Sequence, residues 1–316
     1  MSTLLVASTG GHLRELHRLL PRLPLADDEV MWVTNDTDQG RTLLAGERVV
    51  FLPYQGSRNL SATIRNLGVA RRVTSQTRFG AVVSTGSAIA LSFLPLAAVR
   101  GITCHYIESG TRVGSPSLTG RILRSSPGVH CYAQHHELAG RGWHYGGSVL
   151  EGFQPVRTRA TEIRRVVVTL GTWRQGFRRL VERLVRIIPP GVDTLWQTGH
   201  TDVDDLPIQS TPWVTPAELQ TALREADVVV THAGMGATLD ALEAGRMPVS
   251  VPRRRFAGEQ IDDHQLELAS QLEHLGLAVV KAADGLRYED LVSAAAWKVN
   301  QCDVPPFILE RGSDRA

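Results

Sequence analysis

Residues 226–245 read ADVVVTHAGMGATLDALEAG, and this stretch decides the fold. Its three consecutive valines form a β-branched run that is too short for a helix and apolar on both faces, as a central parallel strand requires. A glycine-interrupted turn follows at 232–237, and apolar residues at helical spacing over 238–244 end at Gly245. The stretch therefore predicts a strand, a glycine turn and a helix.

The glycine turn is a candidate phosphate site. Glycine lets a ligand come close to the bare backbone, and the N-terminus of the following helix points unpaired N–H groups at it. Asp240 lies one turn into that helix, where a carboxylate can accept hydrogen bonds from a ribose. Glycines at such turns also serve packing alone, so the motif by itself leaves both interpretations open.

A polar segment farther along the chain favours the binding interpretation. It follows a strand predicted at 248–252 and ends in hydrogen-bonding side chains, Asp262, Asp263, His264 and Gln265. Such side chains at the carboxyl end of a strand suit a hydroxyl-rich ligand better than a core.

Length and composition narrow the class of protein. A chain of 316 residues with 42% hydrophobic content is about two domains long and can bury two cores. Its 34 basic and 32 acidic residues nearly balance, which argues against a general nucleic-acid binder, although a pI of about 8.6 leaves room for a local basic patch. We therefore expect no nucleic-acid partner.

Cysteine use and the apolar runs predict a cytoplasmic location. Cys104, Cys131 and Cys302 are far apart and form no C-x-x-C pair, which is typical of a reducing compartment. The chain starts directly with a strand predicted at 4–7, so we expect no signal peptide. The longest apolar run, at 88–99, is too short to span a bilayer, so we expect any membrane contact to be peripheral.

The first half repeats the strand, glycine turn and helix of the second half, at 4–20 and again at 80–94. Aliphatic content drops and charge rises over 152–164, which indicates a boundary. We therefore predict two similar α/β domains that face each other, over residues 1–155 and 156–316. A helix at 288–299 closes the second domain, and we expect the tail at 301–316 to be loose.

A basic helix is predicted at 60–73. It carries Arg65, Arg71 and Arg72, with Arg58 just before it. These arginines form either a solvated face or a patch for an anionic membrane or a pyrophosphate.

Two clusters of metal-ligand residue types are interpreted as surface features. His135 and His136 are adjacent in sequence and therefore point apart. Asp202, Asp204 and Asp205 lie in a stretch without apolar support, which favours a solvated loop over a metal site.

These motifs together resemble a known group of glycosyltransferases. The second half looks like the carboxyl-terminal domain of MurG-type enzymes, and still more like the catalytic subunit of the two-subunit N-acetylglucosaminyltransferase of asparagine-linked glycosylation. The matching segments are VVTLGT at 167–172, HAGMGAT at 232–238, DALEAG at 240–245, PVSVPR at 248–253 and HQLELA at 264–269.

The first half resembles the partner subunit of that enzyme and bacterial capsular or exopolysaccharide relatives, as if both subunits were fused. The matching segments are STGGH at 8–12, STG at 84–86, YIES at 106–109, RV at 112–113 and PSLTG at 116–120. Two departures stand out. The family often has Glu where this chain has Asp240, and the membrane-spanning anchor often found in the partner subunit is missing.

The resemblance implies a GT-B fold, in which two Rossmann-like domains with parallel sheets face a cleft between them. It implies an inverting glycosyltransferase with no cofactor and no metal, in which helix N-termini and backbone amides neutralise the leaving diphosphate. The implied donor is a nucleotide diphosphate sugar, with a UDP-sugar expected. The implied acceptor is a glycan or polyprenyl-diphosphate-linked sugar of polysaccharide or cell-envelope biosynthesis, met at the inner face of the cell membrane.

The resemblance also assigns roles to individual residues. On the donor side, Val214 holds the base, Asp240 the ribose, and His264 with Gln265 the donor sugar. The glycine turns hold the diphosphate through Gly171, Thr172, Gly234 and Gly236, beside His232 and Thr238. The acceptor residues are Gly10, Gly11, Gly86, Arg112, Ser117 and Thr119.

An inverting transfer needs a general base for the acceptor hydroxyl. His12 lies at the N-terminus of the first predicted helix, where the positive end of the dipole disfavours imidazolium and keeps the ring neutral. Glu108, at the carboxyl end of a strand predicted at 102–107, is the competing base. His12 can instead merely cap its turn.

Four alternatives stay open. The acceptor can be a soluble natural product, or the protein can be a sugar-nucleotide 2-epimerase that uses the donor site alone. A non-catalytic donor-binding or partner-binding protein is the third. A nicotinamide enzyme is the weakest, because no third glycine follows Gly11 to complete G-x-G-x-x-G. The basic and polar segment at 112–124 favours a second substrate, and so a transferase.

Overall fold

The computed structural model describes residues 2–25, 29–54, 60–159, 162–171, 174–260 and 264–310. The chain divides into two compact units, Met1–Glu151 with Val304–Ala316 and Gly152–Asp303, called the first and the second unit below. The first break falls at 151/152, where the sequence led us to expect 155/156. Four residues named above lie outside the described residues: Arg58, Thr172, Asp262 and Asp263.

The first unit is built on a parallel sheet of order β3-β2-β1-β4-β5-β6-β7. Its strands are β1 Ser2–Ala7, β2 Val30–Asn35, β3 Arg48–Leu52, β4 Phe79–Gly86, β5 Thr103–Ile107, β6 Val129–Ala133 and β7 His144–Tyr145. The order reverses between β1 and β4, so the carboxyl ends of these two strands form the switch point at which Rossmann-like domains bind ligands.

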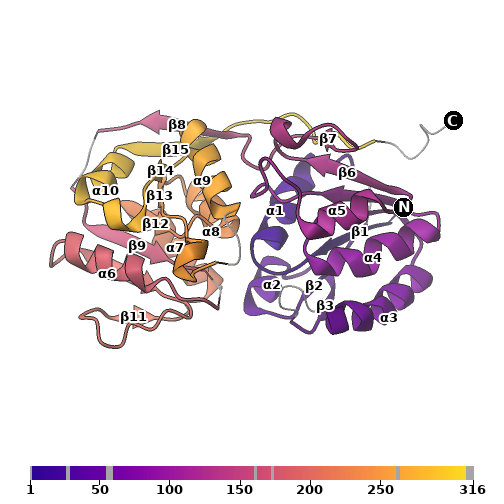
Figure 1. Cartoon of the computed structure of the whole chain (residues 1–316), viewed down its shortest axis with the longest axis horizontal. Helices are drawn as coiled ribbons and strands as arrows, with labels where there is room; N and C mark the ends of the chain where they lie inside the picture. The colour runs from indigo at the N-terminus through magenta and orange to yellow at the C-terminus, as the bar shows by residue number, and fades with distance from the viewer. Residues whose placement is uncertain are drawn as a thin grey trace. The chain divides into compact units, whose positions relative to one another are not determined.

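Helices connect these strands. They are α1 Gly11–Leu19, α2 Asp38–Leu43, α3 Leu60–Gln76, α4 Ala88–Val99 and α5 Leu118–Arg124, with 3₁₀ turns η1 Leu20–Arg22 and η2 His136–Leu138. Helix α4 packs on β1, β4 and β5, and α3 and α5 flank it (Figure 1). None of the helices in the described part of either unit has both the length and the apolar character to cross a membrane.

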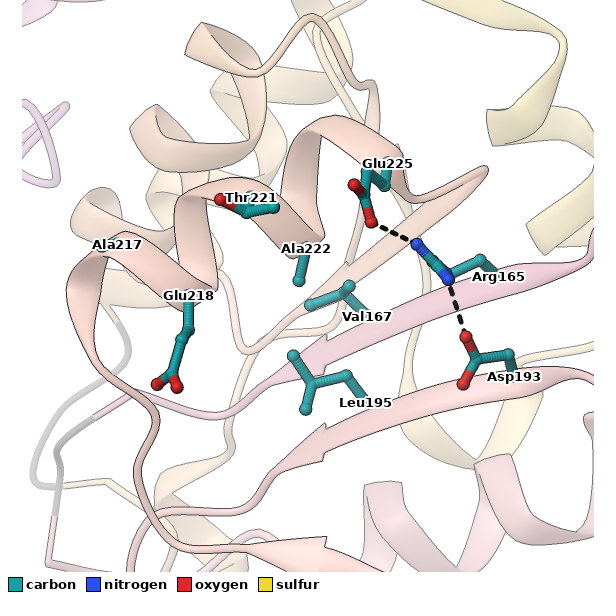
Figure 2. A pocket seen from close by; sticks show the side chains of 9 residues that line it. All are labelled: Arg165, Val167, Asp193, Leu195, Ala217, Glu218, Thr221, Ala222 and Glu225. Atoms are coloured by element: carbon teal, nitrogen blue, oxygen red, sulfur yellow. Dashed lines mark hydrogen bonds and ion pairs between the residues drawn. The ribbon is translucent and has the colours of Figure 1, made fainter.

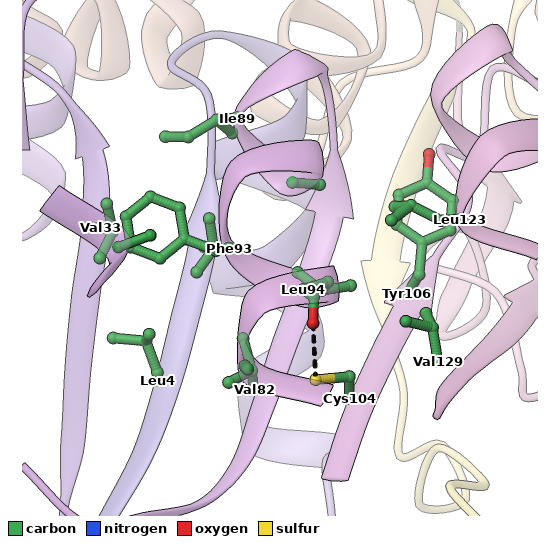
Figure 3. Packing of buried hydrophobic residues seen from close by; sticks show 14 of the residues in the cluster. Leu4, Val33, Val82, Ile89, Phe93, Leu94, Cys104, Tyr106, Leu123 and Val129 are labelled. Atoms are coloured by element: carbon green, nitrogen blue, oxygen red, sulfur yellow. Dashed lines mark hydrogen bonds between the residues drawn. The ribbon is translucent and has the colours of Figure 1, made fainter. Parts of the chain in front are cut away.

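The core of the first unit lies between α4 and the sheet. Phe93 and Leu94 of α4 face Val82 of β4 and Leu4 of β1, and all four are fully buried (Figure 3). The Cys104 thiol of β5 donates to the Leu94 carbonyl at 3.3 Å. The apolar run that is too short for a membrane span is therefore a buried helix of an α/β core.

The second unit repeats the same topology. Its parallel sheet has the order β11-β10-β9-β12-β13-β14, so its switch point lies between β9 and β12. The strands are β9 Arg165–Thr169, β10 Asp193–Gln197, β11 Ser210–Thr211, β12 Val228–Thr231, β13 Pro248–Ser250 and β14 Val279–Val280. An antiparallel pair, β8 Phe153–Arg157 and β15 Trp297–Gln301, forms a separate small sheet.

Its helices are α6 Arg178–Ile187, α7 Pro216–Glu225, α8 Met235–Glu243, α9 His264–His274 and α10 Tyr288–Ala295, with 3₁₀ turns η3 Arg255–Ala257 and η4 Ala283–Gly285. Alternate valines of β12 belong to different cores. Val228 and Val230 join the cluster with Leu180 of α6, whereas Val229 packs with Leu223 of α7. The run predicted to be apolar on both faces is thus the central strand, covered on both sides.

Two predicted helices have different bounds. The helix expected at 238–244 begins earlier, at Met235, because Gly234 takes an extended N-cap conformation and its carbonyl accepts from Thr238 N at 2.9 Å. The helix expected at 288–299 ends at Ala295, because Trp297–Gln301 pairs with β8 instead.

The expectation of a loose tail is wrong for residues 304–310. Phe307 is 1% exposed, its N–H donates to the Arg22 carbonyl at 2.7 Å, and its ring meets Tyr132 edge-on at 6.0 Å. Glu310 Oε2 lies 3.1 Å from His130 Nδ1. This segment therefore packs on the first unit, although the sequence assigned it to the second.

Candidate functional site

The switch point of the first unit holds His12. The residue follows β1 as the second residue of α1, and its half-buried ring places Nδ1 2.9 Å from the Thr85 carbonyl at the end of β4. A carbonyl only accepts, so Nδ1 carries the proton and Nε2 the lone pair. The Thr85 hydroxyl donates back to the His12 carbonyl at 2.7 Å. These two hydrogen bonds fix the orientation of the ring and keep a proton on Nδ1.

Gly86 lets this arrangement form. Its φ of +112° lies in the left-handed region, and a Cβ there would stand 3.2 Å from the Tyr106 hydroxyl and 3.4 Å from His12 Cε1. His12, Gly86 and Tyr106 therefore lie together at the carboxyl edge of the sheet.

Glu108 lies just beyond Tyr106 but is 1% exposed. Its two oxygens accept four hydrogen bonds, from the Tyr106 hydroxyl, the Ser109 N–H, and the N–H and hydroxyl of Ser117. Burial raises the pKa of the Glu108 carboxyl above its ordinary value, while these hydrogen bonds act in the opposite direction. This carboxyl fastens the start of α5 to β5.

Glu15 is a buried acid that the sequence did not single out. It is fully buried on α1 and accepts from the Ser109 hydroxyl at 2.6 Å, the Gly110 N–H at 3.0 Å and Gln134 Nε2 at 2.9 Å. Burial raises the pKa of Glu15 to about 7. These partners lie about 94 to 119 positions away in sequence, so no local pattern points to them.

His135 belongs to the same loop cluster, which corrects its interpretation as a surface residue. It is 4% exposed, and its Nε2 donates to the Gly110 carbonyl at 2.7 Å. Its neighbour His136 is exposed, as expected.

The predicted acceptor residues surround these groups. Gly10, with φ +90°, caps α1, and its N–H donates to Gln39 Oε1 at 2.7 Å. Gly11 opens the helix, and Arg112 lies half-buried in the loop after β5. Ser117 caps α5 by accepting from the Gly120 N–H at 3.0 Å, and Thr119 is half-buried in the first turn.

The switch point of the second unit holds His232. It is 8% exposed, and its Nδ1 lies 3.4 Å from the Thr169 carbonyl. Burial, together with the charge of Arg253, lowers the pKa of His232 to about 3, so the ring is neutral.

The glycines around His232 make room for its ring. A Cβ on Gly234 would stand 2.2 Å from Nε2, and one on Gly171, whose φ is +68°, would stand 2.4 Å from Cε1. The residue of this turn with positive φ is Ala233, at 56°. A non-glycine residue in that region is strained, and such strain collects at functional sites. Gly236 lies inside the first turn of α8.

The predicted base and ribose contacts both border α7. Val214 is half-buried between β11 and α7, next to Trp213, which meets His200 edge-on at 5.3 Å. Asp240 is half-buried on α8, and its Oδ1 accepts from Gln220 Nε2 of α7 at 3.2 Å. Thr238 is fully buried one turn into α8.

The predicted donor-sugar residues open α9. His264 is half-buried, whereas Gln265 is 4% exposed and its Oε1 accepts from the Arg253 N–H at 3.0 Å. Arg253 is a functional candidate that the sequence missed. Its guanidinium donates to the Leu170 carbonyl at 2.9 Å, beside the Gly171 turn.

In the cluster of Asp202, Asp204 and Asp205, one member forms an ion pair with Arg178. Asp205 accepts from Arg178 Nη1 at 2.7 Å and Nη2 at 2.6 Å, and Asp202 and Asp204 are exposed. Within the residues that the structure describes, no three His, Cys, Asp or Glu side chains are placed to hold a metal ion.

The described part of the second unit includes the following two pockets. One of about 490 Å³ opens at the carboxyl edge, lined among others by Gly176, His200, Thr201 and Glu259. The other, of about 470 Å³, lies between α7 and the β9–β10 face, where Arg165 pairs with Asp193 and Glu225 beside Val167 and Leu195 (Figure 2). Neither of these pockets is lined by a predicted donor or acceptor residue.

Comparison with known proteins finds a related family for part of the second unit. Residues 166–291 match the family model of the glycosyltransferase family 28 C-terminal domain. No curated protein sequence matches the chain.

Solved structures share the fold along nearly the whole chain. MurG of Acinetobacter baumannii is 18% identical over 94% of this chain and 94% of its own, with a TM-score of 0.58. The glycosyltransferase SnogD from Streptomyces nogalater is 19% identical over 94% and 93%, with a TM-score of 0.59. The spinosyn rhamnosyltransferase SpnG complexed with thymidine diphosphate is 16% identical over 94% and 91%, with a TM-score of 0.55.

The two Rossmann-like units have the fold of GT-B glycosyltransferases, and with the family 28 domain they identify the chain as a glycosyltransferase. Among the solved structures of that class, it resembles MurG.

Proposed function

We propose that the protein is an inverting glycosyltransferase that uses His12 as its general base and needs no metal ion. The acceptor hydroxyl oxygen bonds to the anomeric carbon of the donor sugar, the bond from that carbon to the diphosphate oxygen breaks, and the hydroxyl proton passes to His12 Nε2. A single displacement of this kind inverts the anomeric centre. The observation that carries the proposal is the Nδ1 hydrogen bond to Thr85, which leaves Nε2 as the basic atom.

Glu108 is assigned a structural role instead. A general base needs an oxygen that is available to the acceptor hydroxyl, and both oxygens of this carboxyl already accept hydrogen bonds. Loss of Glu108 is therefore expected to loosen the Ser117 cap of α5 rather than to remove the proton acceptor.

The donor is a nucleotide diphosphate sugar, with a UDP-sugar as the first candidate. The N-terminus of α8 and the turns at Gly171 and Gly234 supply backbone N–H groups for the diphosphate. Asp240 holds the ribose and Val214 contacts the base. The thymidine diphosphate bound to SpnG, a protein of the same fold, supports a nucleoside diphosphate as the ligand class.

The acceptor is a glycan or a polyprenyl-diphosphate-linked sugar at the cytoplasmic face of the membrane. Helix α3 exposes Ile64 and Leu67 beside Arg65, Arg71 and Arg72. Helix α5 exposes Leu118 and Ile122 beside Arg121 and Arg124. Each basic residue near an anionic surface contributes roughly 1 kcal/mol, enough in sum for reversible attachment.

Activity is tested by incubating the protein with a panel of nucleotide sugars and prenyl-diphosphate sugars, with and without excess EDTA, and reading products by mass spectrometry. We expect a product of inverted configuration in both conditions. Activity that EDTA abolishes and Mg²⁺ or Mn²⁺ restores contradicts the metal-free mechanism. Conversion of the donor alone to its 2-epimer identifies an epimerase.

The acceptor class is tested by co-sedimentation with anionic and neutral liposomes at low and high salt. We expect binding to anionic liposomes at low salt, and its loss when Arg65, Arg71 and Arg72 are all changed to Gln. The matched control changes three exposed arginines of the second unit, Arg157, Arg164 and Arg186, and keeps binding. Negligible binding throughout contradicts the membrane surface and favours a soluble natural-product acceptor, as the likeness to the spinosyn rhamnosyltransferase allows.

A further inference from the structure

Arg253 is a buried cation with unused hydrogen-bond donors. It follows β13 at the carboxyl edge of the second sheet, and its side chain is 1% exposed. Nη2 donates to the Leu170 carbonyl at 2.9 Å, whereas Nε and Nη1 have no partner among the residues that the structure describes. A buried donor without an acceptor is destabilising, and a buried charge without a partner is more so.

Among the described residues, the neighbours of Arg253 hold it in place and none of them forms an ion pair with it. The Arg253 N–H donates to Gln265 Oε1 at 3.0 Å, and the guanidinium lies 5.5 Å from the centre of the Phe177 ring. Glu259, the carboxylate that acts on Arg253 electrostatically, is bound by both Arg179 Nε at 3.1 Å and Arg179 Nη2 at 3.0 Å. The second unit therefore keeps a positive charge at this edge of its sheet.

The charge lies where the donor diphosphate is expected. Leu170, which accepts from Arg253, immediately precedes the Gly171 turn, and the charge of Arg253 acts on His232, which precedes the N-terminus of α8. Burial lowers the pKa of Arg253 only to about 10, so the group is cationic at neutral pH. A helix N-terminus supplies about half a charge, which leaves most of a diphosphate's charge to other groups.

We infer that Arg253 binds the diphosphate of the donor and supplies the countercharge when it leaves, an assignment that rests on the function proposed above. The two unused donors match the forked geometry with which arginine binds phosphate oxygens. Arg253 thereby takes the electrostatic part that a divalent cation plays in metal-dependent transferases.

A variant without the charge separates this role from a structural one. Arg253→Met keeps the volume and removes the unsatisfied donors. Replacing a buried, poorly paired charge by an apolar group is often neutral or stabilising. Ligand binding requires the charge, so Arg253→Met is expected to leave the melting temperature of the free protein unchanged or raise it, and to weaken nucleoside diphosphate binding.

The probes are UDP and TDP by calorimetry, with uridine and thymidine by saturation-transfer NMR. We expect Arg253→Met to raise the Kd of the bound diphosphate by about tenfold or more, with the nucleoside signal unchanged. Arg253→Lys keeps the charge but not the forked pair of guanidinium donors. It is expected to recover part of the diphosphate affinity that Arg253→Met loses. Should Arg253→Met fail to fold, Arg253→Gln takes its place, because its amide can still donate to Leu170.

Arg246 is the matched control. It is a half-buried arginine near the opposite end of β13, and its guanidinium donates to the Arg224 carbonyl. Its Nε likewise has no partner within the described part of the chain. Arg246→Met is expected to leave diphosphate affinity unchanged.

The outcomes distinguish this assignment from the proposed function. If the wild type binds neither diphosphate, the proposed function fails first. If it binds one and the folded Arg253 variants bind it equally well, the assignment of Arg253 is overturned. Parallel losses for diphosphate and nucleoside, with a lower melting temperature, also overturn it and show a structural role.

Discussion

Each unit has a histidine at its switch point, with Nδ1 close to a backbone carbonyl. The two histidines follow non-equivalent strands of their sheets. In the first unit, His12 follows β1 and its Nδ1 faces Thr85 of β4 at 2.9 Å. In the second, His232 follows β12, the counterpart of β4, and its Nδ1 faces Thr169 of β9 at 3.4 Å. In both rings a proton is thus kept on Nδ1, from opposite sides of equivalent crevices.

The two rings differ in exposure. His12 is half-buried, whereas His232 is 8% exposed between Gly171 and Gly234 and lies under the influence of Arg253. The more exposed His12 ring is therefore the candidate base, whereas the buried His232 ring packs between Gly171 and Gly234. Gly171 and Gly234 therefore make room for the His232 ring as well as for any phosphate.

The largest expected effect is on turnover. His12→Ala removes the proton acceptor, so kcat is expected to fall about 10²- to 10⁴-fold with little change in donor KM. The free energy of unfolding should change by only about 1 kcal/mol, since one partly exposed hydrogen bond is lost. The measurements are steady-state kinetics and urea denaturation. A Glu108→Gln variant that loses turnover to the same extent while keeping its stability would move the base to Glu108.

The next effect is on stability as a function of pH, and it has opposite signs in the two units. The folded-state pKa of Glu15, about 7, lies above its ordinary value of 4.5, so its contribution to stability is complete below about pH 4.5 and is lost as pH rises through 7. A difference of that size is worth roughly 3 kcal/mol. Calorimetric melting of the wild type and Glu15→Gln between about pH 3 and 8 isolates this contribution, because the wild type should lose stability relative to the variant as pH rises from 4.5 to 7.

His232 provides the contrast within the same experiment. Its folded-state pKa of about 3 lies below the ordinary 6.5, so stability that is present above pH 6.5 is lost as pH falls towards 3. Melting of the wild type should therefore pass through a maximum as pH varies. Identical pH dependences for the wild type and Glu15→Gln would mean that Glu15 is solvated.

A smaller effect is expected on donor affinity. Asp240→Ala removes a charged hydrogen bond to the ribose worth about 1.5 to 3 kcal/mol, or one to two decades in donor KM. The fold should persist, because the side chain is half-buried with Gln220 as a partner. Calorimetry with the nucleotide sugar is the check, and unchanged affinity would remove Asp240 from the site.

The last prediction concerns the glycines themselves. Gly234→Ala drives a methyl group into the His232 ring and should cost about 1 to 3 kcal/mol of unfolding free energy. In the first unit, Gly10→Ala meets no atom within 4 Å and costs only backbone strain at φ +90°. In a double-mutant cycle, His232→Ala should relieve the Gly234→Ala penalty. Additive effects would show that the glycine serves another purpose.

The local patterns predicted what depends on neighbouring residues. The valine run of β12, the repeated turns and the buried run at 88–99 all follow from periodicity within one element. They missed what depends on distant partners. Strand β15 requires β8, and burial of the Glu15 and Arg253 side chains requires loops from other strands. Polar residues are expected at the surface, so no pattern marks a buried carboxylate or guanidinium.

The path of the chain has a consequence for dissecting this protein. Both chain ends belong to the first unit, with the second unit inserted at 151/152 and left again at 303/304. A nick at the first connection yields two fragments, yet the later fragment still carries Phe307 and Glu310, which dock on the first unit. A cut at the second connection, 303/304, leaves both units on one fragment. Neither unit can be released by one protease site, and a truncation designed to trim the second unit would instead strip a buried side chain from the first.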